Sequence, residues 1–524
     1  MDAAGIPVWR AMGAVPPPPG RAERAGVVIV GAGPVGLAMA LDLGRRGHDV
    51  IVLALHDFIA AGSKAICFAK RSLDIFDALG VGDAIVDKGV VWNVGKVFRG
   101  NRAAPVLEFD VLPVKDQKRP GFINIQQYHV EERLVEALAT LPNVALRWGH
   151  RLAGLEARDD GATLSVETAE GSYAIHADWV VACDGSRSAA RALLGLDFDG
   201  RVFEDNFLIA DIRIKGKRPA ERWFWFDPPF FAGQSALIHK QPDDVWRLDF
   251  QLGWDVDRAA AVLPENVEPL VRGMLGADVA FEREWYSVYT FQCRRMARFV
   301  HGRVIFAGDS AHLVSPFGAR GCNGGLADVA NLGWKLDLVL RGAGGPGLLD
   351  SYDAEAGAVA DENIRASSRS TDFMTPKSAV SRIFRDAVLE LAAELPFAAP
   401  FVNSGRLSTA VALAGSALNS PDRDDWRGTG LAPGSPALDA RIGEGWLLDR
   451  LGDDFVLLAD GWRGGALDGI AVIDAAGAGG PFADRYALAP GRAYLVRPDQ
   501  YVCARWHTAD RAAVLAALAR AKGN

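Results

Sequence analysis

Three short motifs are rich in glycine, and two of them also contain an aspartate, in patterns that suit nucleotide binding. The first contains Gly31, Gly33 and Gly36, with Ala32 and Pro34 between them, after the apolar run VVIV and before the helix-like segment LAMALDLGRRG. Glycines permit a tight turn and close backbone approach, and the free N–H groups at the start of a helix attract a pyrophosphate. The pattern therefore predicts a dinucleotide site, with a purely structural glycine turn as the alternative.

The other two motifs follow apolar runs that read as buried strands. CDGSRSAAR, at 183–191, places Asp184 and Gly185 at a sheet edge where such ligands bind, although an ordinary Asp-Gly turn would explain this motif better if it stood alone. GDSAHLVSPFGARGCNGG, at 308–325, places Asp309 after the run RVIFAG. Its carboxylate can accept hydrogen bonds from ribityl hydroxyls, and the glycine-rich turn can bring N–H groups to a flavin ring.

The elements that must position these motifs alternate between strands and helices. VVIV and DVIVL read as parallel strands around one helix, a βαβ unit. Residues 71–86 and 128–140 carry helical periodicity, whereas 144–181 alternate like antiparallel strands. Residues 201–290 alternate as strands rich in aromatics, and 325–341 read as a long helix. We therefore expect a nucleotide-binding domain that is split by an inserted sheet.

The C-terminal part changes character twice. Residues 351–425 read as mostly helical, and 428–438 (GTGLAPGSPAL) form a Pro/Gly-rich linker. The strand-like runs FVLLAD, GIAVID and AYLVRP then precede the helix-like ADRAAVLAALARA. This order predicts a small α/β domain at the C-terminus.

Bulk composition restricts the partners. A net charge of −8 over 524 residues, without a Lys/Arg run, argues against nucleic acid as a partner. The five cysteines are odd in number and show neither CxxC nor zinc spacing, so we expect a reducing compartment, the cytoplasm, and no metal site. No signal-peptide core or membrane-crossing run is seen. Residues 1–25, with Pro16–Pro19, are expected to form a mobile leader.

In their order and separations, the three motifs resemble the single-component (class A) flavoprotein aromatic hydroxylases of the p-hydroxybenzoate hydroxylase superfamily. The likeness is strongest to the phenol and 3-(3-hydroxyphenyl)propionate hydroxylase branch, and it covers about Val27 to Ala366. A weaker match at 495–506 (LVRPDQYVCARW) suggests the thioredoxin-like domain of that branch. Because this tail lacks CxxC, we expect it to serve packing or oligomerisation.

The resemblance implies an α/β fold: a Rossmann-like FAD-binding domain, an inserted antiparallel β-sheet substrate domain and a C-terminal thioredoxin-like domain. The expected boundaries are 26–90, 119–200 and 285–395 for the FAD-binding domain, 91–118 and 201–284 for the substrate domain, 396–430 for a helical segment and linker, and 431–524 for the last domain.

The resemblance also implies roles for individual residues. Gln127 would contact FAD, and Lys64 stands where the family commonly has arginine, so the charge is kept but the forked geometry is lost. Asp184 would lie near the pyrophosphate and NAD(P)H, Asp309 on the ribityl chain, and Pro316 beside the reactive edge of the flavin with its carbonyl facing the substrate. The residues expected to line the flavin ring are Gly318, Arg320, Gly321, Cys322 and Asn323.

One position departs from the family pattern. Relatives usually carry an acidic residue eighteen positions after the third glycine, where it holds the adenosine ribose; here that residue is Ala54. Losing such a charged hydrogen bond costs roughly 1.5–3 kcal/mol, so weaker FAD binding is expected. Asp57 could replace it, although a solvated loop carboxylate is the plainer interpretation.

The inserted sheet is expected to cover the flavin, with aromatic side chains as walls of a flat pocket. The candidates are Trp223, Phe224, Trp225, Phe226 and Tyr289, of which about half can face the pocket because strand residues alternate. His239 and Tyr289 could assist phenol deprotonation, and His312 is expected to be structural. The segment from Trp223 to Pro228 is similar to the WxWxIP signature of flavin halogenases, but Asp227 replaces its isoleucine.

These expectations combine into one reaction. An FAD-dependent monooxygenase would hydroxylate a small phenolic substrate with O2, and NADH or NADPH would visit as a transient co-substrate, through a flavin C4a-hydroperoxide. Two alternatives stay open: a flavin monooxygenase of polyketide-type polycyclic substrates, and a non-catalytic FAD-binding protein with a weakened site. The sequence leaves the oligomeric state open, with a homodimer as one outcome.

Overall fold

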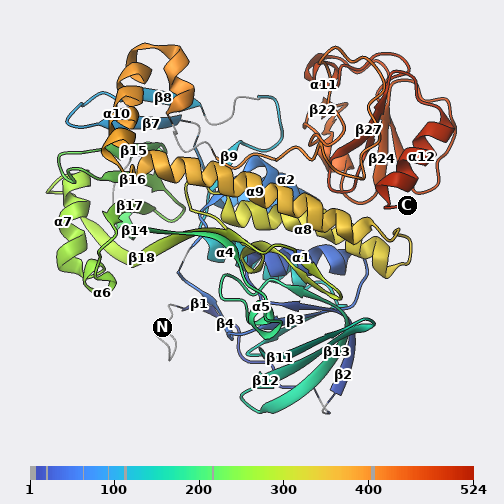
Figure 1. Ribbon diagram of the computed structural model, residues 1–524, viewed down its shortest axis with the longest axis horizontal. Helices are drawn as coiled ribbons and strands as arrows, with labels where there is room; N and C mark the ends of the chain where they lie inside the picture. Colours follow the sequence, from blue (N-terminus) through green and yellow to red (C-terminus); the bar gives the residue numbers. More distant parts are fainter. Residues whose placement is uncertain are drawn as a thin grey trace.

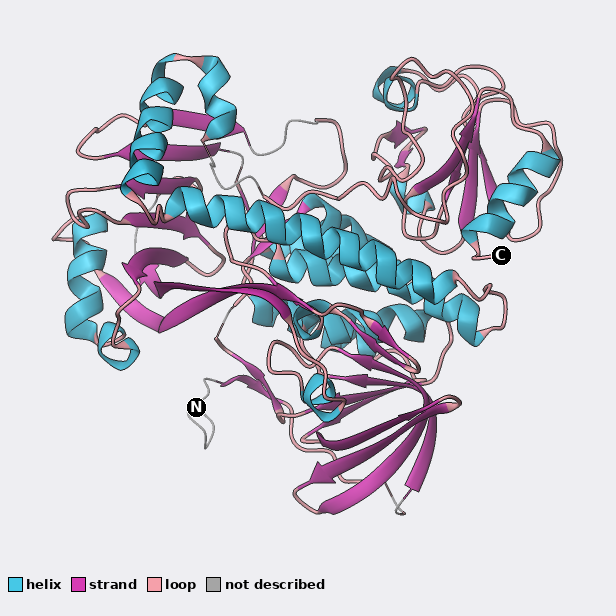
Figure 2. Cartoon of the chain, in the orientation of Figure 1, coloured by secondary structure: helices cyan, strands magenta, loops and turns pink. Residues whose placement is uncertain are grey.

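The computed structural model describes residues 8–524, apart from Pro19, Arg21, Ser63, Asn93, 111–114, 215–217 and 403–406. It is a mixed α/β structure in which two large sheets flank a bundle of long helices, and a smaller C-terminal unit packs beside them (Figure 1; Figure 2). None of the helices in the described part of the chain is long and apolar enough to cross a membrane.

The first sheet has a parallel centre in the order β10-β3-β2-β13-β20. The carboxyl-terminal ends of β2 and β13 are apolar and covered on both faces, with Val28, Ile29, Val180 and Val181 fully buried. Val30, Ala182 and Phe306 are register neighbours on adjacent strands, so the three motifs all leave the sheet at one edge. The strands are β2 (Ala22–Val30), β3 (Val50–Ala54), β10 (Val144–Trp148), β11 (Arg151–Arg158), β12 (Gly161–Thr168), β13 (Gly171–Ala182), β19 (Val300–His301) and β20 (Val304–Phe306).

Helices surround this sheet and carry the loops of the site. Two of them, α8 (Gly321–Leu340) and α9 (Leu348–Met374), run side by side across the middle of the molecule (Figure 1). The others are α1 (Pro34–Arg45), α2 (Lys70–Ala78), α3 (Gly82–Lys88), α4 (Gln127–Leu138), α5 (Ala189–Leu193) and η1 (Gly308–Ser310), and the short strands β5 (Cys67–Ala69), β6 (Val90–Val91) and β9 (Phe122–Asn124) form a sheet of their own.

The second large sheet has the order β21-β18-β14-β17-β16-β15-β7-β8. One face packs on Val267 and Val271 of α7, and the other faces Phe317 and Phe373. Its elements are β7 (Val94–Arg99), β8 (Leu107–Asp110), β14 (Asp199–Ile214), β15 (Arg222–Phe226), β16 (Ser235–Lys240), β17 (Val245–Gly253), α6 (Arg258–Ala261), α7 (Pro264–Leu275), β18 (Phe281–Arg295) and β21 (His312–Leu313).

The C-terminal unit contains a four-stranded sheet in the order β25-β24-β26-β27, in which only the β24–β25 pair is parallel. The β26–β27 hairpin ends in a buried turn, 497–501, that packs toward α8. The elements are β22 (Arg441–Ile442), β23 (Gly445–Trp446), η3 (Leu448–Arg450), β24 (Phe455–Ala459), β25 (Ile470–Asp474), α11 (Gly480–Tyr486), β26 (Ala493–Val496), β27 (Val502–Trp506) and α12 (Arg511–Ala521).

The structure corrects three sequence-based expectations. The described part of the leader, expected to be mobile, packs on the rest of the chain. β1 (Val8–Ala11) pairs with β4 (Phe58–Ala60), and the ring of Trp9 stacks on that of Tyr128 at a centroid distance of 4.2 Å. These contacts join segments far apart in the sequence, so the composition of the leader did not indicate them. β10 is parallel to β3, whereas antiparallel pairing was expected from residue 144 onward. Helix in 351–425 extends through α9, α10 (Ala379–Glu394) and the short η2 (Pro396–Phe401), but 407–425 holds none, because turn-forming residues such as Asn419, Ser420 and Pro421 crowd that segment.

Candidate active site

The first two motifs touch each other at the sheet edge. Gly31 has a φ of +108°, and a Cβ placed on it would lie 2.4 Å from the carbonyl oxygen of Cys183 and 2.9 Å from Cα of Asp184. A Cβ on Gly36 would lie 2.0 Å from the carbonyl oxygen of Gly31. Glycine at 31 and 36 is therefore required by packing within the protein.

Gly33 serves a different purpose. It is the N-cap of α1, no side chain caps that helix, and a Cβ on Gly33 would meet nothing within 4 Å. Gly185, with φ +80°, also has open space around it. Uncapped N–H groups beside open space suit a diphosphate, so the residues present fit the pyrophosphate of FAD.

Asp184 offers one carboxylate oxygen that the protein does not use. Its Oδ2 accepts the N–H of Ala190 at 3.0 Å, whereas its buried Oδ1 has no partner among the residues that the structure describes. Burial raises the pKa of this carboxyl. An unsatisfied buried acceptor is costly, so a ligand hydroxyl or N–H is expected at Oδ1.

Asp309 lies where its carboxylate can reach a ligand. Part of the residue is exposed to solvent, but the protein atoms packed around its carboxyl raise the pKa of that group. The positive charges of His312 and Lys64 act in the opposite direction. The exposed Lys64 also acts on Glu131, whose pKa burial raises to about 7. Burial and the charges of Asp309 and Glu131 raise the pKa of the Cys322 thiol. The charge of Lys64 therefore acts on Asp309, and that of Asp309 acts on Cys322, while the flavin site that they are expected to form remains a proposal.

The Gln127 amide is engaged within the protein. Its Oε1 accepts the N–H of Ala65 at 3.1 Å, and its Nε2 donates to Glu131 at 2.7 Å. In this conformation Gln127 holds the turn that presents Lys64, and its expected contact with FAD remains a proposal.

The loop of the third motif is held by Asn323. The Oδ1 of Asn323 accepts the N–H of Ala69 at 2.9 Å and the hydroxyl of Ser72 at 2.6 Å, and its Nδ2 donates to the carbonyl of Cys67 at 2.9 Å. The loop turns at Gly318 and Ala319, which have φ values of +92° and +53°.

The remaining loop residues differ in exposure. Pro316 is exposed, and its carbonyl accepts the Ala319 N–H at 2.9 Å. Gly321 opens α8, and Arg320 is buried with one nitrogen directed to Asn363. Pro316 is therefore exposed on a fixed loop, and its expected place beside the flavin remains a proposal.

Ala54 closes β3 and is buried. Its carbonyl accepts the N–H of His150 at 2.8 Å, and its side chain carries no group that could bind a ribose. The Asp57 carboxylate is exposed, and its backbone carbonyl accepts the N–H of Met12 at 2.8 Å. Among the described residues, neither position 54 nor position 57 therefore places a buried carboxylate at the end of β3.

The expected pocket residues are divided between two faces of the large sheet. Tyr289 pairs with Phe207, whose ring lies 5.1 Å from that of Phe317, so Tyr289 is on the face that meets the flavin loop. His239 is on the same face, because its ring contacts Cys67 and Asn124 of the FAD-binding part. Both residues therefore lie on the sheet face that meets the flavin loop.

Trp223 and Trp225 lie on the opposite face. Trp223 pairs with Ile238, and both tryptophans join the cluster that packs on α7, whereas Phe224 and Phe226 join the cluster that contains Phe317. The expectation that the two tryptophans bind substrate is not supported by this placement. Strand alternation fixed that they share a face, but only the packing of the sheet decided which face.

A buried cation that the sequence analysis overlooked lies beside His239. Arg222 is 4% exposed, its Nε and Nη1 have no partner among the described residues, and burial lowers its pKa. Its guanidinium stacks over the ring of Phe224 at 4.8 Å. The sequence around Arg222 contains no pattern that indicates a functional residue, because the interest of Arg222 lies in its burial without a carboxylate partner among the described residues.

His239 is neutral at neutral pH. Burial, together with the charges of Arg222 and Arg247, lowers its pKa to about 4 despite the opposing effect of Asp249, whose Oδ2 lies 3.6 Å from Nε2. A neutral imidazole can accept a proton or a hydrogen bond, so its state is compatible with the role expected from the sequence.

Comparison with known proteins identifies the family. The model of the FAD binding domain family matches residues 24–367, more than half of the chain. A 3-(3-hydroxy-phenyl)propionate/3-hydroxycinnamic acid hydroxylase of Burkholderia cenocepacia is 30% identical, over 95% of this chain and 96% of that protein. The chain belongs to the FAD binding domain family and is an FAD-dependent monooxygenase of the aromatic hydroxylase class.

Two further comparisons agree with this assignment. The hydroxylase of the same name from Mycolicibacterium smegmatis is 31% identical over 71% of this chain and 65% of its own length. The crystal structure of the flavin-dependent monooxygenase PieE, in complex with FAD and substrate, superposes with a TM-score of 0.79 at 24% identity, covering 95% of this chain and 99% of that one. Because the identity is 24%, the comparison with PieE supports the fold alone.

Proposed function

We propose that this chain hydroxylates a small phenolic substrate with O2 and NADH or NADPH, on FAD held at the edge of the parallel sheet. The observation that carries the proposal is the contact between the flavin loop and one face of the large sheet. There Phe317 of the loop packs on Phe207, and Tyr289 is the strand partner of Phe207. An aromatic, water-poor face beside a flavin suits a flat substrate.

The FAD site would use residues from all three motifs. Gly31, Ala32, Gly33, Pro34 and Gly36 would hold the pyrophosphate at the start of α1, with Asp184 and Gly185 beside it. Asp309 would bind the ribityl chain, and Lys64, Gln127, Pro316, Gly318, Gly321, Cys322 and Asn323 would surround the ring. When bound, FAD would take electrons from NAD(P)H and activate oxygen for transfer to the substrate.

The protein would orient the phenol and manage its proton. Tyr289 and Pro316 would border the ring, with Phe224 in place of the two tryptophans. His239, being neutral, would accept the hydrogen bond of the phenol, and the buried Arg222 would favour the phenolate or another anionic group nearby. Electron-rich phenolate is the better acceptor of an electrophilic oxygen, so lowering the pKa of the phenol promotes the reaction.

The architecture that we propose is a Rossmann-like FAD-binding domain, an inserted substrate domain and a thioredoxin-like C-terminal domain, at the boundaries expected from the sequence. The order β25-β24-β26-β27 supports the last assignment. We also propose a cytoplasmic location, which five free cysteines favour, and a homodimer, for which the exposed Val380, Ile383 and Phe384 of α10 offer an apolar face.

The test is substrate-stimulated oxidation of NADH and NADPH by the purified protein with FAD, screened over phenols, with mass detection of the product. A product heavier by one oxygen atom supports the proposal. Reduction of bound flavin without any oxygenated product would refute hydroxylation and leave a reductase or oxidase. Protein that cannot take up FAD would refute the site itself.

A further inference from the structure

The C-terminal unit lacks a CxxC pair and its described cysteine, Cys503, is buried, yet its hairpin turn 497–501 is also buried, in contact with α2 and α8. Arg497, Asp499 and Gln500 are each 3% exposed or less. Gln500 adopts a φ of +59°, which directs the turn inward. Burying charged and polar side chains costs free energy, so a turn that only connects two strands would leave such side chains in solvent.

The turn is fixed to α8 and α9 by a buried group of four charges. Arg497 donates to both oxygens of Glu355, at 2.7 and 2.9 Å, and also to Asp499. Lys335 donates to Glu355 at 2.6 Å. Two cations and two carboxylates balance, which is the condition for charges to be tolerated away from water.

Asn331 connects this group to the helix that begins in the flavin loop. Its Nδ2 donates to Glu355 at 2.7 Å and to Asp499 at 3.4 Å, and its Oδ1 accepts from Lys335 at 2.9 Å. Asn331 is two turns along α8 from Asn323. The turn therefore fixes the middle of the helix whose first turn holds the flavin loop.

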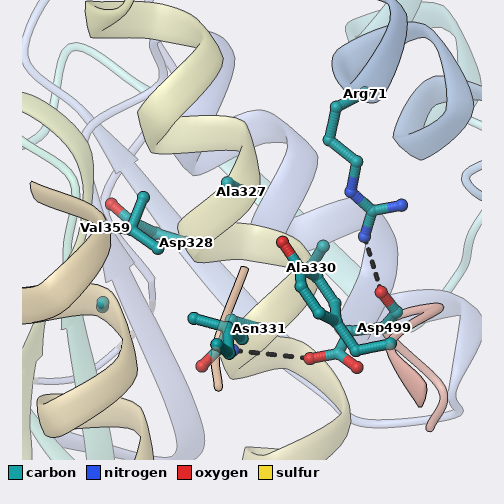
Figure 3. Close-up of a pocket in the computed structure, with 10 residues that line it drawn as sticks. Arg71, Ala327, Asp328, Ala330, Asn331, Val359 and Asp499 are labelled. Atoms are coloured by element: carbon teal, nitrogen blue, oxygen red, sulfur yellow. Dashed lines mark hydrogen bonds between the residues drawn. The ribbon is translucent and has the colours of Figure 1, made fainter. Parts of the chain in front are cut away.

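A second connection runs through α2. Arg71 donates to Oε1 of Gln500 at 2.5 Å and to the backbone carbonyl of Asp499 at 2.6 Å. The next residue, Ser72, donates to Asn323 at 2.6 Å. Figure 3 shows Arg71 and Asn331 reaching Asp499 from two different helices. Between them lies a cavity of about 20 Å³, also bordered by Asp328 and Tyr501, large enough for one water molecule.

We propose that the turn 497–501 is a positioning device for the flavin site: it holds the first turn of α2 and the middle of α8 in the relation that Asn323, in the first turn of α8, requires. Arg71 and Gln500 are its positioning residues on the two sides of the contact. The C-terminal domain thereby contributes to FAD binding without touching FAD. The inference rests on the FAD site of the proposed function and adds a task for a domain that lacks CxxC.

The test is the affinity for FAD of the full chain, measured by flavin fluorescence with neither substrate nor NAD(P)H present. Arg71→Met removes the link from α2, and Gln500→Asn removes it from the other side while keeping a residue that tolerates positive φ. Each is expected to weaken FAD binding about tenfold, as for one lost charged hydrogen bond. The double variant should be no weaker than either single variant, and Arg71→Lys should recover part of the loss.

Arg485→Met is the matched control. Arg485 also joins the C-terminal unit to the rest of the chain through backbone carbonyls, at Lys115 and Asp116, but at a contact without α2 or α8. It should leave FAD affinity unchanged, with all apoproteins unfolding at similar temperatures. Additive losses in the double variant, an equal loss in Arg485→Met, or unchanged affinity in Arg71→Met would each overturn the inference. Wild-type protein that binds FAD but forms no product would instead refute hydroxylation and leave the comparison of affinities intact.

Discussion

Nε2 of His312 lies 2.6 Å from Oδ2 of Asp328, and both side chains are buried beneath the turn that presents Asp309. The same oxygen accepts the N–H of Gly308 at 2.8 Å. One carboxylate on α8 thus holds both ends of the segment 308–312. His312 has the structural role that the sequence suggested, and it acts on the flavin site through the turn.

This pair predicts a pH-dependent stability. Burial disfavours the charged imidazole, but Asp328 and Asp309 outweigh it and raise the pKa of His312. A histidine with a raised folded pKa contributes stability that is complete below its unfolded pKa of about 6.5 and is lost as pH rises through the folded pKa. Asp328→Asn should therefore lower the free energy of unfolding by roughly 1.5–3 kcal/mol near pH 6, and by less at higher pH. Urea unfolding across this range measures it; a difference that does not shrink with rising pH would contradict the ion pair.

The glycines of the first motif should separate packing from ligand binding. Gly36→Ala must displace backbone, since its Cβ would lie 2.0 Å from the Gly31 carbonyl, so thermal unfolding should occur at a markedly lower temperature. Gly33→Ala meets no atom, so the apoprotein should lose no more than about 1 kcal/mol, the usual cost of alanine at an N-cap, while its methyl group crowds the diphosphate and weakens FAD binding. Unfolding temperatures and FAD titrations of both apoproteins would show this, and equal unfolding temperatures would contradict it.

Ala54 predicts weak retention of the cofactor. Ala54→Glu places a carboxylate at the end of β3, where relatives hold the ribose, and should tighten FAD binding about ten- to a hundredfold. Leu55→Glu is the control, because residue 55 follows directly but is 58% exposed. Flavin released on dilution measures the effect. No improvement in Ala54→Glu would mean that other contacts already replace the acid.

The two faces of β15 should respond differently to substitution. Phe224→Leu alters the face that contains Phe317 and should raise KM for the phenol several-fold, whereas Trp225→Leu acts on the α7 face and should mainly lower stability. Steady-state kinetics and thermal unfolding separate the two effects. The opposite pattern, with KM changed only in Trp225→Leu, would show that substrate enters from the other face.

Arg222 predicts a preference for anionic substrates. Arg222→Met removes a buried cation without a carboxylate partner among the described residues, so KM for a phenol with an added carboxylate should rise about tenfold, and that for a neutral phenol should rise little. Kinetics with a matched pair of phenols would test it, with Arg158→Met as a surface control because that side chain is exposed. An equal rise for both phenols would assign Arg222 to packing alone.

The sequence could predict the parts of this protein that depend on local spacing. The glycines at 31, 33 and 36 mark a strand, turn and helix because backbone geometry there excludes side chains, and Asp184 and Asp309 follow buried strands of the same sheet. Ala54 could be identified as a departure from the family because its position is counted along the chain from Gly36. The use of FAD is therefore predictable from short motifs.

Only the tertiary structure decided relations between distant segments. Strand alternation predicted that Trp223 and Trp225 share a face of the sheet, but not that α7 covers that face. No pattern near Arg222 indicated a buried cation beside His239. The order of residues 8–18 depends on β4 and Tyr128, and the link from Gln500 to Arg71 joins residues 429 positions apart. Side-chain direction is local, but burial, face and charge compensation are set by whichever segments pack together, and that is a property of the whole fold.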